Sequence, residues 1–168
     1  DLPLIRGLKA RGYSLSVDLQ SFVRQVDPRT REIRFADVPA KREIVAMMDR
    51  VKLDGVEARI LTGTGDVREA ATLVAGWGCP EVLVTHAEGV AARVHGESLY
   101  ERFSNDSVVG RTGRGDTTFA AYLSHRLDHD PAASLEFAAA LVSIKMESTG
   151  PFRGTPEDVE RRIRERHR

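Results

Sequence analysis

The sequence has a single cysteine and lacks both a long hydrophobic run and a signal peptide. Cys79 cannot form a disulfide within the chain, and such sparse cysteine usage is typical of a reducing compartment. No apolar run approaches the roughly 20 residues that a membrane-spanning helix needs. No charged, apolar and small-residue segments in the order of a signal peptide open the chain. These absences predict a cytoplasmic protein with no membrane partner.

The sequence also has no excess of charge. It contains 25 Lys and Arg residues against 25 Asp and Glu residues, which gives a formal net charge of zero. A protein that coats nucleic acid needs a large basic excess, so we expect no nucleic-acid partner. Of the 168 residues, 41% are apolar, which is enough to build the core of one ordinary domain. We therefore expect residues 1–168 to form a single α/β domain.

Strand-like and helix-like segments alternate along the chain. Strand patterns occur at residues 13–18, 51–53 and 81–85, and a hairpin near Gly96 is expected to join residues 90–94 to residues 99–103. Helix patterns occur near the start of the chain up to Gly12, and at residues 39–50, 66–76, 116–127, 131–148 and from 156 onward. This alternation predicts a mainly parallel sheet covered by helices on both faces, a three-layer α/β/α architecture.

A glycine-rich turn before a predicted helix carries most of the chemical information. Residues 108–123 read V-V-G-R-T-G-R-G-D-T-T-F-A-A-Y-L. Gly113 and Gly115 allow backbone N–H groups to point inward around an anion, and the following helix adds donors and the positive end of its dipole. Asp116 beside such donors suits phosphoryl transfer to an alcohol, which needs a base for the hydroxyl. From spacing alone, the alternative is that Asp116 only caps its helix and the glycines only form a turn.

Four segments resemble the ribokinase-like (PfkB-type) carbohydrate kinases. Residues 113–121 resemble the family's signature D-T-T-G-A-G-D-T-F, and residues 51–63 resemble its N-x-x-E segment. Residues 82–90 resemble its strand that ends in threonine and a glycine turn, and residues 137–151 resemble its alanine-rich helix on the nucleotide side. The segments follow the family's order, so the sequence is identified as the C-terminal portion of such a kinase. The resemblance implies a Rossmann-like, ribokinase-like fold without the N-terminal strands and the lid.

The resemblance implies a reaction and a set of catalytic groups. Asp116 would be the general base that takes the proton from the substrate hydroxyl. The backbone N–H groups of Gly113, Arg114 and Gly115 would form the anion hole for the transferred phosphoryl group. The reaction would be ATP-dependent phosphorylation of a sugar or a related small alcohol.

The resemblance also implies cofactor contacts on two other segments. Asp54 and Glu57 would act around Mg²⁺ through its water ligands, while Thr85 and Gly89 would lie along the ATP. Mg²⁺ prefers oxygen ligands and keeps much of its water, which suits an acidic pair. The alternative for this pair is a capping box, in which the aspartate caps a helix and the glutamate bonds back to it.

Some positions depart from the family's pattern. Asp54 replaces the usual asparagine, and Arg114 replaces a small residue in the anion hole. Gly110 stands where many members have an acidic residue that helps to hold a monovalent cation. We therefore expect an enzyme that depends on Mg²⁺ but responds little to potassium.

The residues that select the sugar belong to segments of the family that have no counterpart here. We therefore expect this chain alone to be inactive, and the sequence does not name the sugar or show whether the protein is a homodimer. One alternative is a non-catalytic nucleotide- or phosphate-binding module, or an inactive kinase fragment. Dinucleotide binding for redox chemistry ranks last, because the glycine turn comes late in the chain and residues 135–136 lie within a predicted helix.

Overall fold

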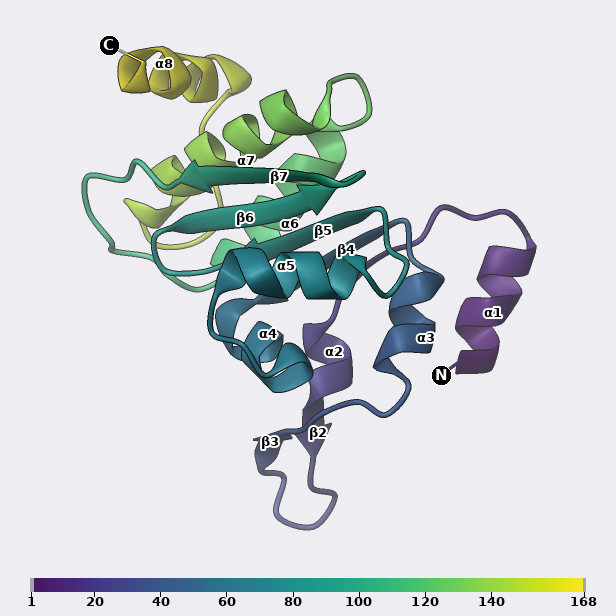
Figure 1. The fold of residues 1–168 in the computed structure, drawn as a ribbon. Coiled ribbons are helices and arrows are strands. Elements are labelled where there is room, and N and C mark those ends of the chain that lie inside the picture. The colour runs from purple at the N-terminus through teal and green to yellow at the C-terminus, as the bar shows by residue number, and fades with distance from the viewer. Residues whose placement is uncertain (1, 168) are drawn as a thin grey trace. The chain divides into compact units, whose positions relative to one another are not determined.

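The computed structural model describes residues 2–167 (Figure 1). Its elements, in chain order, are α1 (Leu2–Ala10), β1 (Ser16–Asp18), α2 (Gln20–Val23), β2 (Arg24–Val26), β3 (Ile33–Phe35), α3 (Lys41–Ala46), β4 (Arg50–Asp54), α4 (Gly55–Thr62), α5 (Val67–Ala75), β5 (Glu81–Thr85), β6 (Gly89–Val94), β7 (Glu97–Arg102), α6 (Arg114–His125), α7 (Pro131–Met146) and α8 (Pro156–Arg166). The chain divides into a first unit, Asp1–His86 with Ala91–Ser98, and a second unit, Ala87–Val90 with Leu99–Arg168.

Five strands form a sheet in the order β1-β4-β5-β6-β7. Strand β4 is parallel to both of its neighbours, with Val51 opposite Val17 of β1 and opposite Val82 of β5. Only His95 and Gly96 separate β6 from β7, and their φ angles of 47° and 89° suit the tight turn of an antiparallel hairpin. The sheet is therefore mixed and mostly parallel, which confirms the predicted α/β architecture.

The first unit has its core on one face of the parallel strands. Side chains alternate across a strand, so Val51 and Leu53 of β4 share this face with Val82 and Val84 of β5. Figure 1 shows α4 and α5 against these strands. The buried helix residues of this core are Val23, Ile44, Val45, Ala58, Leu61, Ala70, Ala71 and Val74.

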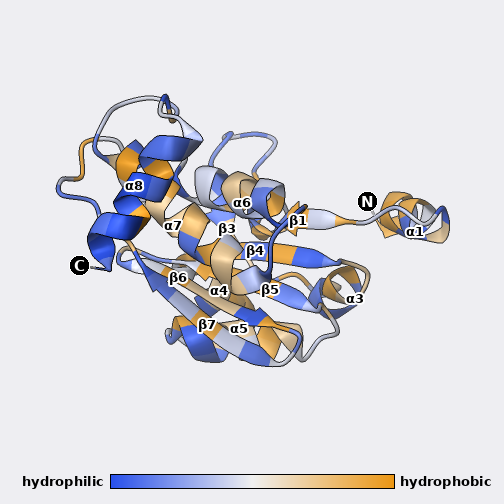
Figure 2. Ribbon diagram, turned by 90° about the horizontal axis from the view of Figure 1, so that it is seen from above, coloured by the Kyte–Doolittle hydropathy of each residue, from blue (hydrophilic) through white to orange (hydrophobic). Residues whose placement is uncertain are grey.

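Helix α7 forms the centre of the second unit. Its buried residues, from Ser134 to Met146, cover most of the helix surface, and Figure 2 shows it as largely hydrophobic beside a mostly hydrophilic α8. Helix α8 packs through Val159, which is fully buried. Arg162 of α8 also forms two hydrogen bonds to the Glu147 carboxylate, of 2.8 and 3.1 Å.

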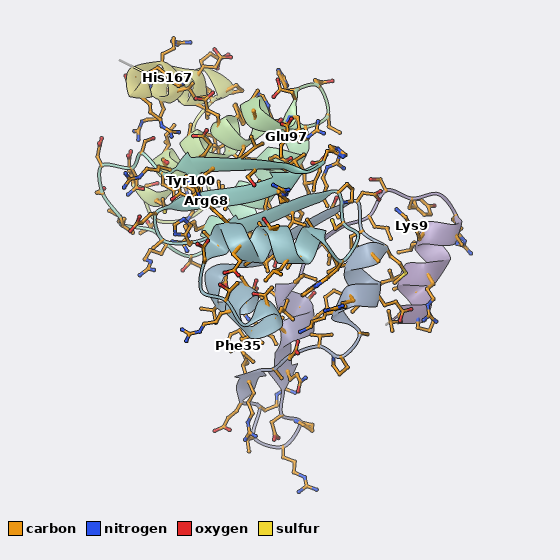
Figure 3. The ribbon with its side chains drawn as sticks, viewed as in Figure 1. Lys9, Phe35, Arg68, Glu97, Tyr100 and His167 are labelled. Atoms are coloured by element: carbon orange, nitrogen blue, oxygen red, sulfur yellow. The ribbon has the colours of Figure 1, made fainter. Side chains whose placement is uncertain are left out.

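Two peripheral parts complete the first unit. Lys9 of α1 pairs with Asp49, its Nζ lying 3.0 Å from each carboxylate oxygen (Figure 3). Strands β2 and β3 form a separate antiparallel hairpin in which Val26 is opposite Ile33 and Phe35 is exposed (Figure 3). The sequence analysis did not predict this hairpin. None of the helices within residues 2–167 is both long enough and apolar enough to cross a membrane.

Candidate active site

A pocket of about 520 Å³ surrounds the glycine turn of the second unit. It is lined by residues that precede and begin α6, by the end of α7 and by the chain after α7: Val109, Gly110, Arg111, Thr112, Gly113, Asp116, Thr117, Lys145, Thr149, Gly150 and Pro151. Gly113 is the N-cap of α6 and has a φ of 76°, a conformation that glycine adopts at little cost. Of the predicted catalytic residues, Gly113 and Asp116 therefore line this pocket, whereas Arg114 and Gly115 do not.

The first turn of α6 presents backbone donors. Within the described residues, the N–H groups of Gly113, Gly115 and Asp116 have no hydrogen-bond acceptor. The N–H of Arg114, which the sequence placed in the anion hole, donates to the carbonyl of Arg111 at 3.2 Å. The donors available to an anion thus lie on either side of Arg114, at the positive end of the helix dipole.

Asp116 lies at the third position of α6 and is exposed. Its Oδ2 lies 3.9 Å from the position that a Cβ atom on Gly113 would occupy, so the carboxylate is beside the turn. The cap of α6 is Gly113, and no side-chain hydrogen bond caps this helix. The alternative in which Asp116 only caps its helix is therefore wrong. The Asp116 side chain instead lines the pocket.

A lysine that the sequence analysis did not single out lies under the same turn. Lys145 of α7 is only 2% exposed, and its Nζ donates to the carbonyls of Gly110 and Thr112 at 2.7 and 2.5 Å. The N–H groups of Val109 and Gly110 in turn donate to the carbonyl of Met146. The C-terminal end of α7 thus fixes the segment that leads into the glycine turn. The available sequence signal was a single lysine at the end of the mostly apolar segment of residues 137–146.

Gly110 has a packing reason to be glycine. A Cβ atom there would lie 2.1 Å from the carbonyl oxygen of Ser148 and 3.2 Å from the Cα of Thr149. No side chain fits in this space without moving the backbone. The acidic residue that many members of the resembled family carry at this position is therefore sterically excluded here.

Asp54 and Thr85 lie at the carboxyl ends of two neighbouring parallel strands in the first unit. They are register partners of β4 and β5, and Thr85 is buried. The Asp54 side chain caps α4 by accepting from the N–H groups of Val56 and Glu57 at 2.8 and 2.9 Å. The carboxyl ends of parallel strands are where α/β sheets bind ligands. The structure therefore brings together three of the predicted residues, Asp54, Glu57 and Thr85, at this edge.

Glu57 is fully buried and completes the capping box. Its Oε2 accepts from the N–H of Asp54 at 2.7 Å, whereas its Oε1 is buried with no partner among the described residues. Burial raises the pKa of the Glu57 carboxyl above its usual value, although the bond from the Asp54 N–H opposes this shift. The capping alternative is thus present in the structure, but it leaves one buried carboxylate oxygen for another ligand.

A lysine and an aspartate form an ion pair between β4 and β1. The Lys52 Nζ is 2.8 Å from Oδ2 of Asp18, the last residue of β1, and the Lys52 side chain is almost completely buried. The sequence analysis noted that the first strand ends in a carboxylate but gave neither residue a role. The alternation of side chains along β4 could have indicated a separate role for Lys52, because this side chain lies on the opposite face from Val51 and Leu53.

Gly89 begins β6 in the second unit. A Cβ atom there would lie 2.3 Å from the carbonyl oxygen of Glu101 and 3.1 Å from the Cα of Arg102. This close approach of two backbones explains the glycine without any ligand. Gly89 does not line the pocket around Asp116, and its proposed place along a nucleotide stays a prediction.

Comparisons with known proteins identify the fold. No protein-family model and no curated protein match the chain. A pyrophosphate-dependent kinase in the ribokinase family, solved as a sulfate complex, is 36% identical with a TM-score of 0.84, and the match covers 94% of this chain and 55% of that one. A myo-inositol kinase mutant derived from a pyrophosphate-dependent enzyme is 36% identical with a TM-score of 0.85, and the match covers 98% of this chain and 58% of that one. Ribokinase from Arabidopsis thaliana, solved with ribose and ATP, is 22% identical with a TM-score of 0.72, and the match covers 95% of this chain and 50% of that one.

The chain has the ribokinase-like carbohydrate kinase fold. This result confirms the resemblance inferred from the four sequence segments and the predicted three-layer architecture. The chain spans 55–58% of the length of the three 36%-identical structures. The comparisons therefore identify the fold of this chain. They do not assign roles to its individual residues.

Proposed function

We propose that the full-length natural protein transfers the terminal phosphoryl group of a phosphate donor to a hydroxyl of a sugar or cyclic polyol. The fold is that of sugar and inositol kinases, which supports a kinase in general terms. The observation that carries the proposal is that Asp116 and Gly113 line one pocket, where, within residues 2–167, neither the Asp116 carboxylate nor the Gly113 N–H has a hydrogen-bond partner.

The proposed chemistry follows from these groups. The acceptor hydroxyl gives its proton to the Asp116 carboxylate as its oxygen forms a bond to the terminal phosphorus. The bond between that phosphorus and the bridging oxygen breaks, and the electron pair leaves with the shortened donor. The backbone N–H groups of Gly113, Gly115 and Asp116 stabilise the negative charge on the transferred group. The Arg114 N–H does not contribute to this stabilisation, because it donates to the carbonyl of Arg111.

The acidic pair on α4 fits a Mg²⁺ ion that keeps most of its water. Within residues 2–167 no cluster of three metal-ligating side chains occurs, which argues against an ion enclosed by protein ligands. Glu57 nevertheless has a buried Oε1 without a partner, and one oxygen of Asp54 is free of the cap. Asp54 and Glu57 would hold the ion through its waters. When bound, Mg²⁺ supplies positive charge that neutralises the phosphates of the donor.

The donor has two candidates. ATP is the donor that the motif resemblance implies, and the ribokinase of Arabidopsis thaliana was solved with it. Pyrophosphate is favoured by a specific observation, since the 36%-identical structures are of pyrophosphate-dependent kinases. The glycine turn of this chain suits either one, because backbone N–H groups bind a phosphate without reading the rest of the molecule.

The test is an assay of the full-length protein with each donor against myo-inositol, ribose and related polyols, followed by mass spectrometry. We expect a phosphorylated polyol that requires both donor and Mg²⁺, and the preferred donor decides between the two candidates. Donor binding without phosphorylation of any acceptor would favour the binding-module alternative. We further propose that the 168 residues alone bind the donor weakly and do not phosphorylate an acceptor, because they match little more than half of the length of the kinases above.

A further inference from the structure

The buried ammonium of Lys145 has an environment that is unusual for a lysine. Both of its hydrogen-bond acceptors are backbone carbonyls, those of Gly110 and Thr112. Lys145 forms no ion pair with a carboxylate among the described residues, in contrast to the equally buried Lys52, which pairs with Asp18. A charge that is buried without a counter-ion is costly, so this lysine needs another source of stabilisation.

Backbone carbonyl oxygens are the ligands that bind a dehydrated monovalent cation. In cation-selective sites they replace the water shell of the ion. The Lys145 ammonium carries the same single charge, has three N–H groups and is tethered to α7. The two carbonyls belong to the segment that leads directly into Gly113. A free cation at this place would have to bind from solution, whereas the lysine is always present.

We propose that Lys145 is a built-in monovalent cation that holds the carbonyls of Gly110 and Thr112 and so keeps the glycine turn in its anion-binding shape. The contact explains why the segment does not need an acidic side chain, which the close approach of Gly110 to Ser148 excludes. It also places a positive charge beside the pocket, and no carboxylate among the described residues forms an ion pair with it. Lys145 is thus a positioning residue, and the proposal rests on the proposed function only in taking the turn as a phosphate site.

The first test replaces the lysine and asks whether a free cation takes its place. Lys145→Ala removes the ammonium and opens a space beside the two carbonyls, whereas Lys145→Met removes the charge but fills that space. Thermal melts of the wild type and both variants are recorded in chloride salts of potassium, ammonium and tetramethylammonium at equal ionic strength. Tetramethylammonium is too large to be enclosed and has no N–H group, so it controls for general salt effects.

We expect the melting temperature of the wild type to be the same in all three salts. Lys145→Ala should melt lower in tetramethylammonium and recover most of this loss in potassium or ammonium, while Lys145→Met should show no such recovery. Cation-specific stabilisation of the wild type would overturn the proposal. So would a Lys145→Ala protein that melts like the wild type, or one that stays unfolded or equally unstable in every salt.

The second test separates this proposal from the proposed function. Titration calorimetry with pyrophosphate should show binding to the wild type and about tenfold weaker binding to Lys145→Met, because the variant loses a nearby positive charge and the order of the turn. Hydrogen exchange of the Arg114 and Thr117 amides, which are hydrogen-bonded to the carbonyls of Arg111 and Gly113 in the wild type, should be faster in Lys145→Met, with α8 unchanged. Absence of pyrophosphate binding by the wild type would count against the phosphate site, whereas unchanged exchange in the variant would overturn the role of Lys145.

Discussion

Asp54 and Glu57 bind each other reciprocally across the first turn of α4. Oδ1 of Asp54 accepts from the Glu57 N–H at 2.9 Å, and Oε2 of Glu57 accepts from the Asp54 N–H at 2.7 Å. Such a capping box normally forms at a helix surface, but here the glutamate is fully buried and one of its oxygens is unsatisfied. A buried, unsatisfied carboxylate such as that of Glu57 is typical of sites that bind a ligand.

The buried glutamate should make stability depend on pH in a characteristic direction. Burial raises the pKa of Glu57 above 4.5 in the folded state, so the folded protein holds this proton more tightly than the unfolded one. The free energy of unfolding should therefore fall as pH rises from about 4.5 through the raised pKa. Glu57→Gln should lack this slope in urea titrations across that range. Glu88→Gln, at an exposed site, should match the wild type, and identical slopes in wild type and Glu57→Gln would contradict the account.

Gly110→Ala should destabilise the protein. The added methyl group would overlap the carbonyl oxygen of Ser148, and relieving that overlap moves the carbonyl that Lys145 holds. We expect a loss of about 1–3 kcal/mol in the free energy of unfolding. Gly7→Ala is the matched control, because no atom lies within 4 Å of a Cβ at this helical position. This control should gain up to about 1 kcal/mol, and equal effects of the two changes would refute the packing argument.

Arg162→Lys should cost more stability than the same change at Arg164. The Arg162 guanidinium forms two bonds to Glu147 and a third, of 2.8 Å, to the carbonyl of Ser104. A lysine cannot reproduce this planar arrangement, so we expect a loss of about 1–3 kcal/mol in chemical denaturation. The Arg164–Glu160 pair is exposed, and Arg164→Lys should change stability by less than about 0.5 kcal/mol. Similar losses at both positions would show that the Glu147 contact contributes little.

The parts of the fold that sequence predicted best are those that local signals determine. The strand predicted at residues 81–85 and the helix predicted at residues 66–76 correspond to β5 and α5. Helix α6 begins at Arg114, two residues before its predicted start, because Gly113 rather than Asp116 is the cap. The β2–β3 hairpin was missed because its two strands have only three residues each and none of these residues is buried, so no alternation between a buried and an exposed face marked the strands.

The candidate site was predicted only in part, for a related reason. Asp116 and the glycine turn are contiguous in sequence, so one motif was enough to find them. Lys145 lies 33 residues from Thr112 and 35 from Gly110, and only the folded chain brings its ammonium to their carbonyls. The occupation of the Arg114 N–H by Arg111 depends likewise on the conformation of the turn, which composition does not specify.

The most direct test of the central claim is Asp116→Asn in the full-length protein. The variant keeps the shape of the side chain but cannot accept the substrate proton, so kcat should fall by roughly 10²–10⁴-fold while donor affinity stays equal or improves. Stability should change by no more than about 1 kcal/mol, since the side chain caps nothing and contributes only its charge near a helix N-terminus. Asp128→Asn, an exposed aspartate outside the pocket, is the matched control and should behave as wild type. The account predicts a folded, donor-binding and inactive Asp116→Asn protein, and near-normal kcat in that variant would contradict it.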